Sequence, residues 1–260
     1  MALALGAAPT PAQDFAAPEA PGAAPSPAAF LERALPAQHP SLAAEALVSH
    51  WYDVPGLTTR ALALSAGWRT LRAAAGISRT GDPELGWSAA ALALGVAGEG
   101  GGGALRAVVR RDAAPGALAV ELGPGAGLEV GGGAWVDAGF GITLSASAPQ
   151  VLVRGVGPPL ARGLEIGALW VMDDLALRLA RVSPRGGGGG AWHDATLALA
   201  AGPLTVWLGA RDQPARGSLG LAARARALAV AGVVESHPLL GETVRLSIGL
   251  ARLPEADLPP

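Results

Sequence analysis

A histidine beside an aspartate is the residue pair in this sequence that comes nearest to acid–base chemistry. His193 and Asp194 stand shortly after a run of glycines, and a histidine positioned by a carboxylate can transfer protons. The pair also marks the expected start of a β-strand, and this structural role is the favoured interpretation. The other histidines, His39, His50 and His237, are scattered, and their spacing matches no metal-binding motif such as His-Glu-x-x-His.

Other catalytic signatures are missing from the sequence. Residues Gly123–Gly127 resemble a nucleotide-binding loop, but Pro124 and the lack of a following helical pattern indicate a plain turn. The chain has no cysteine and no lysine, which excludes thiolate nucleophiles, thiolate metal sites, Schiff-base lysines and the Walker A lysine. No Gly-x-Ser-x-Gly nucleophile elbow is present. The sequence therefore predicts a protein that is not an enzyme and that carries no cofactor.

Most of the chain alternates large apolar residues with small or polar ones, in segments separated by Gly, Pro or Asp. Phe140–Ser145 and Val244–Leu250 show this pattern of a β-strand with one apolar face. Fifteen segments fit it, among them a short one at Ala117–Leu122, while Val151–Val156 is ambiguous. Single-chain bacterial barrels generally have an even number of strands. We therefore expect an all-β, antiparallel transmembrane barrel with short loops and about 14 strands, within a range of about 12 to 16.

Composition favours lipid, rather than a protein core, against the apolar face. Hydrophobic residues make up 50% of the chain and charged residues 15%, with a mean hydropathy of +0.36. No run of about twenty apolar residues is present to form a membrane helix. The second face of the strands is mostly Ala, Gly, Ser and Thr, whereas a water-facing surface carries roughly a quarter or more of charged residues. A small, sparsely charged face suits an enclosed lumen.

Charged residues recur on the small face and are expected to line this lumen. They are Arg72, Arg106, Arg110, Glu121, Glu129, Glu165, Arg178, Arg224, Arg226, Glu235 and Arg245. Both signs are present, which favours an internal network of ion pairs and hydrogen bonds that fills the barrel. The alternative is an anion-selective or solute-guiding ladder.

Several tryptophans stand at the ends of the expected strands, where outer-membrane barrels carry interfacial aromatic girdles. We expect interfacial positions for Trp51, Trp68, Trp87 and Trp192. Packing inside a protein core is the alternative for the same four residues.

The chain divides into four regions. Residues 1–13 resemble the remnant of a secretory signal peptide, or else form an Ala-rich tail. Residues 14–43 are a Pro/Ala-rich linker with a short helix. Asp14–Pro27 is expected to be disordered or extended, and Pro27–Leu35 to form the helix, which Ser26 caps. Residues 44–252 form the barrel, and 253–260 form a tail.

One segment resembles a known family. In Ala37–Leu57, Pro40-Ser41-Leu42 is followed by Val48-Ser49-His50. This resembles the opening of bacterial outer-membrane barrels of the PorV/FadL-like kind, in which Asn-Pro-Ala/Ser-x-Leu precedes a first strand that reads like Val-Ser-His. The resemblance implies 14 strands, a place in the outer membrane, and a role in the uptake of apolar solutes or the anchoring of secretion components.

The predicted function is that of a bacterial outer-membrane β-barrel, either a narrow, porin-like transport channel or a structural and anchoring protein. The expected partners are the lipid bilayer and, as candidates, small or apolar solutes or secretion components. A net charge of −2 gives no electrostatic case for nucleic acid as a partner. The alternative is a soluble or surface-exposed all-β binding module, such as a sandwich.

Overall fold

The computed structural model describes residues 15–23, 25–39, 41–54, 56–81, 86–113, 125–155, 162–184, 190–238 and 240–252. The proposed signal remnant, the tail and the expected strand Ala117–Leu122 lie outside these residues. Among the described residues, no helix is long and apolar enough to cross a membrane.

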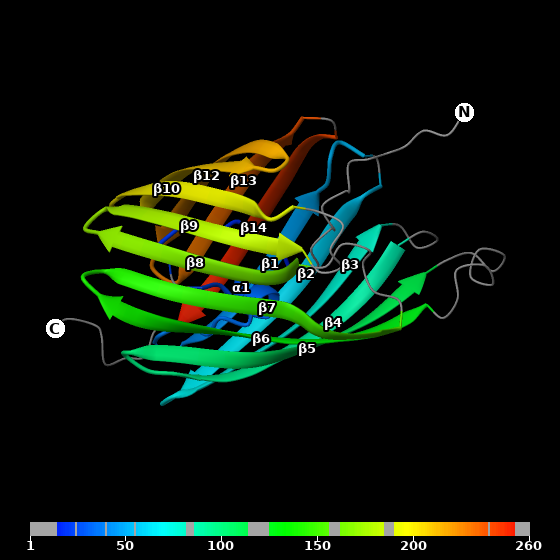
Figure 1. Cartoon of the computed structure of the whole chain (residues 1–260), viewed down its shortest axis with the longest axis horizontal. Helices are drawn as coiled ribbons and strands as arrows, with labels where there is room; N and C mark the ends of the chain where they lie inside the picture. Colours follow the sequence, from blue (N-terminus) through cyan, green and yellow to red (C-terminus); the bar gives the residue numbers. More distant parts are fainter. Residues whose placement is uncertain are drawn as a thin grey trace.

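One antiparallel sheet of fourteen strands closes on itself, because β1 pairs with both β2 and β14 (Figure 1). The strands are β1 Leu42–His50, β2 Thr58–Trp68, β3 Leu71–Gly81, β4 Gly86–Ala97, β5 Gly101–Ala113, β6 Ala126–Gly139, β7 Ile142–Gly155, β8 Arg162–Met172, β9 Leu175–Pro184, β10 Trp192–Ala201, β11 Leu204–Asp212, β12 Ala215–Ala225, β13 Leu228–His237 and β14 Gly241–Arg252. The prediction of a barrel with about 14 strands is confirmed, and a two-sheet sandwich is ruled out as the fold.

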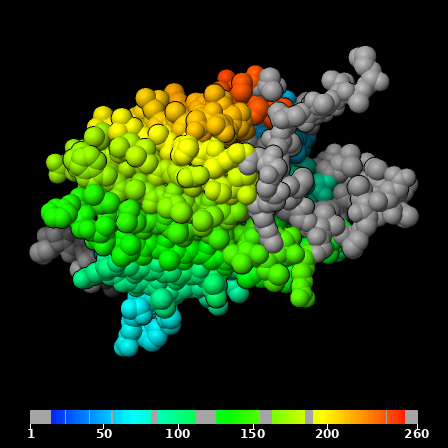
Figure 2. Space-filling view, viewed as in Figure 1, coloured from blue at the N-terminus to red at the C-terminus, as the bar shows by residue number. Residues whose placement is uncertain are grey.

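The large apolar side chains face outward. On β2, Leu62 and Leu64 are 58% and 59% exposed, whereas the alternating Ala61 and Ala63 are 5% and 2% exposed. Such alternation is the direct result of the two-residue period of a strand. In space-filling view the strands from β6 to β12 form a continuous wall (Figure 2). The sheet therefore carries its apolar face on the outside of the molecule, the reverse of a soluble barrel.

The two ends of the barrel differ in their connections. At the short-turn end, pairs of residues such as Phe140 and Gly141, or Asp173 and Asp174, join neighbouring strands. Positive φ angles at Phe140, Gly141 and Asp173 match the primed turns that fit twisted hairpins. The opposite end, here the loop end, holds longer connections such as the one between β1 and β2. The turn predicted at Asp173-Asp174 is confirmed.

A short helix, α1 (Pro27–Arg33), lies inside the ring of strands (Figure 1). The Ser26 side chain accepts a hydrogen bond from the Ala29 amide, and Pro27 occupies the first turn, as the sequence indicates. Phe15 and Leu31 are fully buried. We call residues 15–39 the plug segment. Its packing corrects the expectation of a disordered or extended linker, because the inner wall supplies the apolar surface and hydrogen-bond partners that such a sequence cannot provide by itself.

Candidate functional site: a lumen divided by the plug segment

Small inward side chains on β2 and β3 make room for the plug segment. Phe15 and Leu31 pack in one cluster with alanines of the barrel wall, among them Ala63 and Ala74. A Cβ atom at Gly76 would lie 2.6 Å from Leu31 Cδ1 and 2.8 Å from Phe15 Cε1. The small face that indicated a tight lumen is therefore, over this half of the barrel, the seat of an apolar plug.

Two arginines of the wall hold the main chain of the plug segment. The Arg72 guanidinium donates to the carbonyls of Ala37 and Gln38 at 2.9 and 2.5 Å. Arg106 donates to the Glu32 carbonyl at 2.5 Å. Hydrogen bonds of this kind, with a charged donor, are stronger than neutral ones. The last turn of α1 and the chain beyond it are thus bound by side chains of β3 and β5.

Further wall residues satisfy the ends of the helix. The Glu45 carboxylate accepts from the Ala28 amide at 3.1 Å, near the helix N-terminus. At the other end, the Ser147 hydroxyl donates to the Arg33 carbonyl at 2.5 Å. Trp135 Nε1 donates to the Pro36 carbonyl at 2.9 Å. Polar groups of the plug that would otherwise be buried without partners are therefore paired with the barrel.

Gly133 on β6 lies against the main chain of the plug segment. A Cβ atom there would lie 2.7 Å from the Arg33 carbonyl oxygen and 3.0 Å from that of Ala34. We expect Gly133→Ala to lower the free energy of unfolding by about 1–3 kcal/mol, because the backbone of the plug must move. Gly249→Ala is the control, since its Cβ would meet the Ala44 carbonyl oxygen at an ordinary 3.5 Å. Urea unfolding in detergent compares the two, and equal losses would contradict the contact.

A fully buried carboxylate lies beside the plug. Glu129 is 1% exposed and accepts from Arg110 at 2.7 Å and from Gln150 at 2.9 Å. Arg106 lies 3.8 Å from its other oxygen, so one carboxylate faces two guanidinium groups. Such a cluster is stable only while its members are paired, because an isolated buried charge is strongly unfavourable.

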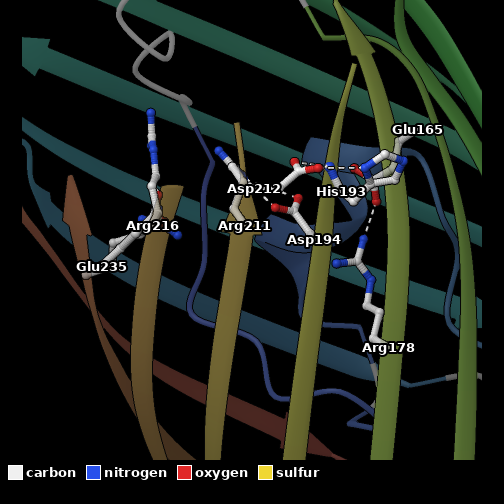
Figure 3. A network of polar contacts seen from close by, with 9 residues as sticks. Glu165, Arg178, His193, Asp194, Arg211, Asp212, Arg216 and Glu235 are labelled. Carbon is white, nitrogen blue, oxygen red and sulfur yellow. Dashed lines mark hydrogen bonds and ion pairs between the residues drawn. The ribbon is translucent and has the colours of Figure 1, made fainter. Parts of the chain in front are cut away.

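The other half of the lumen, along β8–β14, contains a cavity of about 150 Å³ with many charged side chains in its lining. Ala20 of the plug segment packs against Trp207 and Val233 on this side. Figure 3 shows its ion pairs on neighbouring strands. Arg178 pairs with Glu165, and Arg211 donates to both oxygens of Asp194 at 2.5 and 3.2 Å. These pairs cross from one strand to the next, so each depends on the register of the sheet.

A three-residue bridge continues this network. Glu235 accepts from Arg216 at 2.8 Å and from Arg245 at 2.6 Å. The lining of the cavity holds five arginines and five acidic residues, which are Arg33, Arg178, Arg211, Arg216, Arg245, Glu19, Glu32, Glu165, Asp194 and Glu235. Charge along the cavity is therefore balanced.

Arg33 connects the plug segment to this cavity. Its guanidinium lies 3.0 Å from the Glu19 carboxylate and 3.9 Å from that of Glu165 on β8. Burial favours the neutral form of this side chain, but the carboxylates of Glu19 and Glu165 outweigh it, and the pKa of Arg33 lies above its ordinary value. The ion pairs of the wall and the plug thus form one electrostatic unit. The protein is a plugged β-barrel.

The candidate lumen residues fall into three groups in the plugged barrel. Eight of them lie on the inward face in buried or half-buried positions: Arg72, Arg106, Arg110, Glu129, Glu165, Arg178, Glu235 and Arg245. Arg224 shares the inward alternation of β12 but is exposed near the short-turn end, and Arg226 lies in the turn that follows. Glu121 lies outside the described residues.

Sequence reasoning missed several members of the network, among them Asp194, Arg211 and Arg216. Strand alternation could have placed them in the lumen, because Asp194 lies on the same inward face as Thr196, and Arg211 on the same inward face as Trp207. The interpretation of His193-Asp194 only as the start of a strand left the inward position of Asp194 unrecognised. His193 instead points outward to Asp212, at 2.8 Å, so neighbouring residues serve opposite faces (Figure 3).

The expected aromatic girdle needs correction. Of the four predicted interfacial residues, Trp68 faces outward and is 66% exposed. Trp51 is 3% exposed and donates to Thr59 inside the barrel at 2.8 Å. Trp87 and Trp192 lie opposite the buried, inward-facing Thr80 and Val182. A residue at the end of a strand lies near one end of the barrel. Whether its side chain points into the lumen or outward depends on the alternation of residues along the strand.

No protein-family model matches the chain, and a search of curated proteins finds no match. Solved structures with a similar arrangement of strands include mutants of the porin of Rhodopseudomonas blastica. A triple mutant aligns with a TM-score of 0.45 and 11% identity, over 82% of this chain and 99% of that one. Two other mutants align with TM-scores of 0.47 at 11% and 12% identity, over the same shares. Such identity does not indicate a shared function, and the PorV/FadL-like resemblance of Ala37–Leu57 stays a prediction.

Proposed function

We propose that the protein spans the bacterial outer membrane and forms a narrow channel for small polar solutes, which the plug segment restricts. The observation that carries this proposal is the unequal division of the lumen. Helix α1 fills the side next to β1–β7, Ala20 of the plug segment packs against β9, β10, β11 and β13, and charged side chains line the cavity that remains beside β8–β14. A polar cavity inside an apolar shell is the feature that a passive channel for polar solutes needs.

The outer surface supports the place in a membrane. Leu246 and Ile248 on β14 are 54% and 50% exposed, and comparable apolar side chains occur on the other strands. A surface of this kind in water would be an aggregation hazard, whereas in lipid it is stabilising. A closed sheet also leaves no strand edge to be hydrated.

The size and polarity of the cavity narrow the class of solute. A volume of about 150 Å³ is of the order that holds a few water molecules or one small ring compound. Ten charged side chains in its lining disfavour apolar solutes. We therefore favour water, inorganic ions and small polar metabolites over the apolar solutes that the family resemblance implies.

A structural or anchoring role is the second candidate. The many bonds between wall and plug, for example those of Arg72 and Ser147, favour a barrel that stays closed. In that case the plug stabilises the barrel instead of restricting a flow.

Planar-bilayer recording with the full, detergent-folded chain tests the proposal. We expect small, regular conductance steps. A folded and inserted barrel without steps would favour the structural role. A protein that folds without detergent and stays in the aqueous phase would contradict the place in a membrane.

Charge balance in the cavity leads to a prediction about selectivity. In a KCl gradient the intact channel is expected to show a reversal potential near zero. Glu235→Gln should shift the potential toward that of chloride, because Arg216 and Arg245 lose their shared carboxylate. Arg178→Gln should shift it toward that of potassium, because Glu165 loses a cation. Shifts of the same sign in both variants would contradict a route through this cavity.

A further inference from the structure

The outward face of the barrel carries one sign of charge along its loop end. On β2–β9, the described charged residues with outward, exposed side chains are all arginines. They are Arg60, Arg79, Arg111, Arg154 and Arg181, and we call them the outer arginine row. Acidic residues of the same strands, such as Glu129 and Glu165, face the lumen instead. On these strands the outward face is positively charged, while the described acidic residues face the lumen. This difference indicates a distinct role for the row.

Part of the row follows a single line of cross-strand neighbours. Arg60 lies directly opposite Arg79, Arg79 opposite Ser88, and Ser88 opposite Arg111. Directly opposed residues of an antiparallel pair have Cα atoms about 4.5–5.5 Å apart. An anion bound across the line could accept from several guanidinium groups and the Ser88 hydroxyl.

The row lies at the edge of the apolar band. Along β2, Arg60 is followed on the same face by Leu62 and Leu64, and the face ends with the exposed Trp68. Eight residues of strand span about 26 Å, which is about 20 Å along the barrel axis at the usual tilt. This is close to the height of the lipid-facing band of outer-membrane barrels. The guanidinium groups therefore stand at the level of lipid headgroups.

The two edges of the band differ in chemistry. At the short-turn end the outward, exposed groups include three aromatic residues, Trp68, Phe140 and Trp170, which are 66%, 97% and 42% exposed. Aromatic rings suit an interface of either leaflet, whereas a row of arginines suits a leaflet with anionic headgroups. The row is also confined to one side, since outward charges on β11 and β14 include the acidic Asp212 and Glu242.

We propose that the outer arginine row binds phosphate groups of lipid headgroups in the leaflet at the loop end. The planar guanidinium group binds phosphate through two parallel hydrogen bonds, a geometry that lysine cannot offer. The inference rests on the membrane-spanning position proposed above, but it does not require that the barrel conducts.

Folding of the full chain into vesicles tests the inference. Two vesicle types are compared, one of phosphatidylcholine alone and one that also contains a lipid with an exposed phosphate monoester. Folded and unfolded barrels migrate differently on gels, and the measured quantity is the thermal midpoint, the temperature at which half of the protein has left the folded band. The test variant is Arg60→Gln with Arg111→Gln. The matched control is Arg69→Gln with Arg226→Gln, which removes the same charge from turns at the short-turn end.

Phosphate lipid is expected to raise the midpoint of the intact chain and of the control variant, and to raise that of the test variant by less than half as much. Equal increases in all three proteins would overturn the inference. So would an equal loss in both variants, which would indicate non-specific attraction. Inorganic phosphate with phosphatidylcholine vesicles should have no effect, and a full effect there would assign the row to a soluble anion. A chain that fails to insert into either vesicle type would contradict the membrane proposal itself.

Discussion

Deletion of residues 15–39 is expected to convert the narrow channel into a wide one, with conductance steps larger on the order of tenfold, because a fourteen-stranded barrel without its plug encloses a continuous aqueous lumen. The barrel should still fold. Its backbone hydrogen bonds run between strands, and wall residues such as Arg72 and Arg106 would be hydrated when the plug is gone. Single-channel recording of the deletion variant and the intact chain measures the difference.

A milder pair of variants guards against misfolding of the deletion. Phe15→Ala with Leu31→Ala removes two large, fully buried side chains of the plug and should produce brief, large openings on a background of small steps. Leu62→Ala with Leu64→Ala removes as many apolar groups from the outer face and should leave the steps unchanged. A folded deletion variant whose steps match those of the intact chain would show that the plug does not obstruct the path.

Loss of the Glu129 carboxylate should be the most destabilising single substitution in the barrel wall. Glu129→Ala removes the carboxylate that Arg110 and Gln150 bind in a fully buried site, which is expected to lower the free energy of unfolding by about 3–5 kcal/mol. Glu129→Gln keeps an acceptor for Arg110 and should cost less. Urea unfolding from vesicles, followed by tryptophan fluorescence, compares the variants.

Glu242→Ala is the control for this substitution. Glu242 is exposed at the loop end, so its loss should change stability by no more than about 0.5 kcal/mol. A loss below about 1 kcal/mol for Glu129→Ala would show that its guanidinium partners are solvated or paired elsewhere.

Local pattern was sufficient to predict the strands, whereas their number followed from the even strand count of single-chain barrels. Each of the fourteen strands overlaps a segment found by alternation, since a period of two residues is fixed by the backbone. The single strand β7 overlaps both Phe140–Ser145 and the ambiguous segment Val151–Val156. Its pairing with β6 is interrupted between Val130 and Gly132, where a glycine leaves room for a bulge. The helix was predictable for the same reason, because the cap at Ser26 and the proline at Pro27 act within one turn.

The sequence by itself determined which residues share a face, but not which partners they meet. Arg216, Glu235 and Arg245 come together because β12, β13 and β14 pair in one register, and register is set by the closed sheet as a whole. The plug is the clearest case. Its Pro/Ala-rich sequence has no apolar pattern strong enough to predict its position, and the inner wall alone supplies Gly76, Arg72 and Ser147 to receive it. Tertiary structure therefore added the plug to the charged network that the sequence predicted and left a polar cavity beside β8–β14, because burial and hydrogen bonding depend on contacts between residues far apart in the chain.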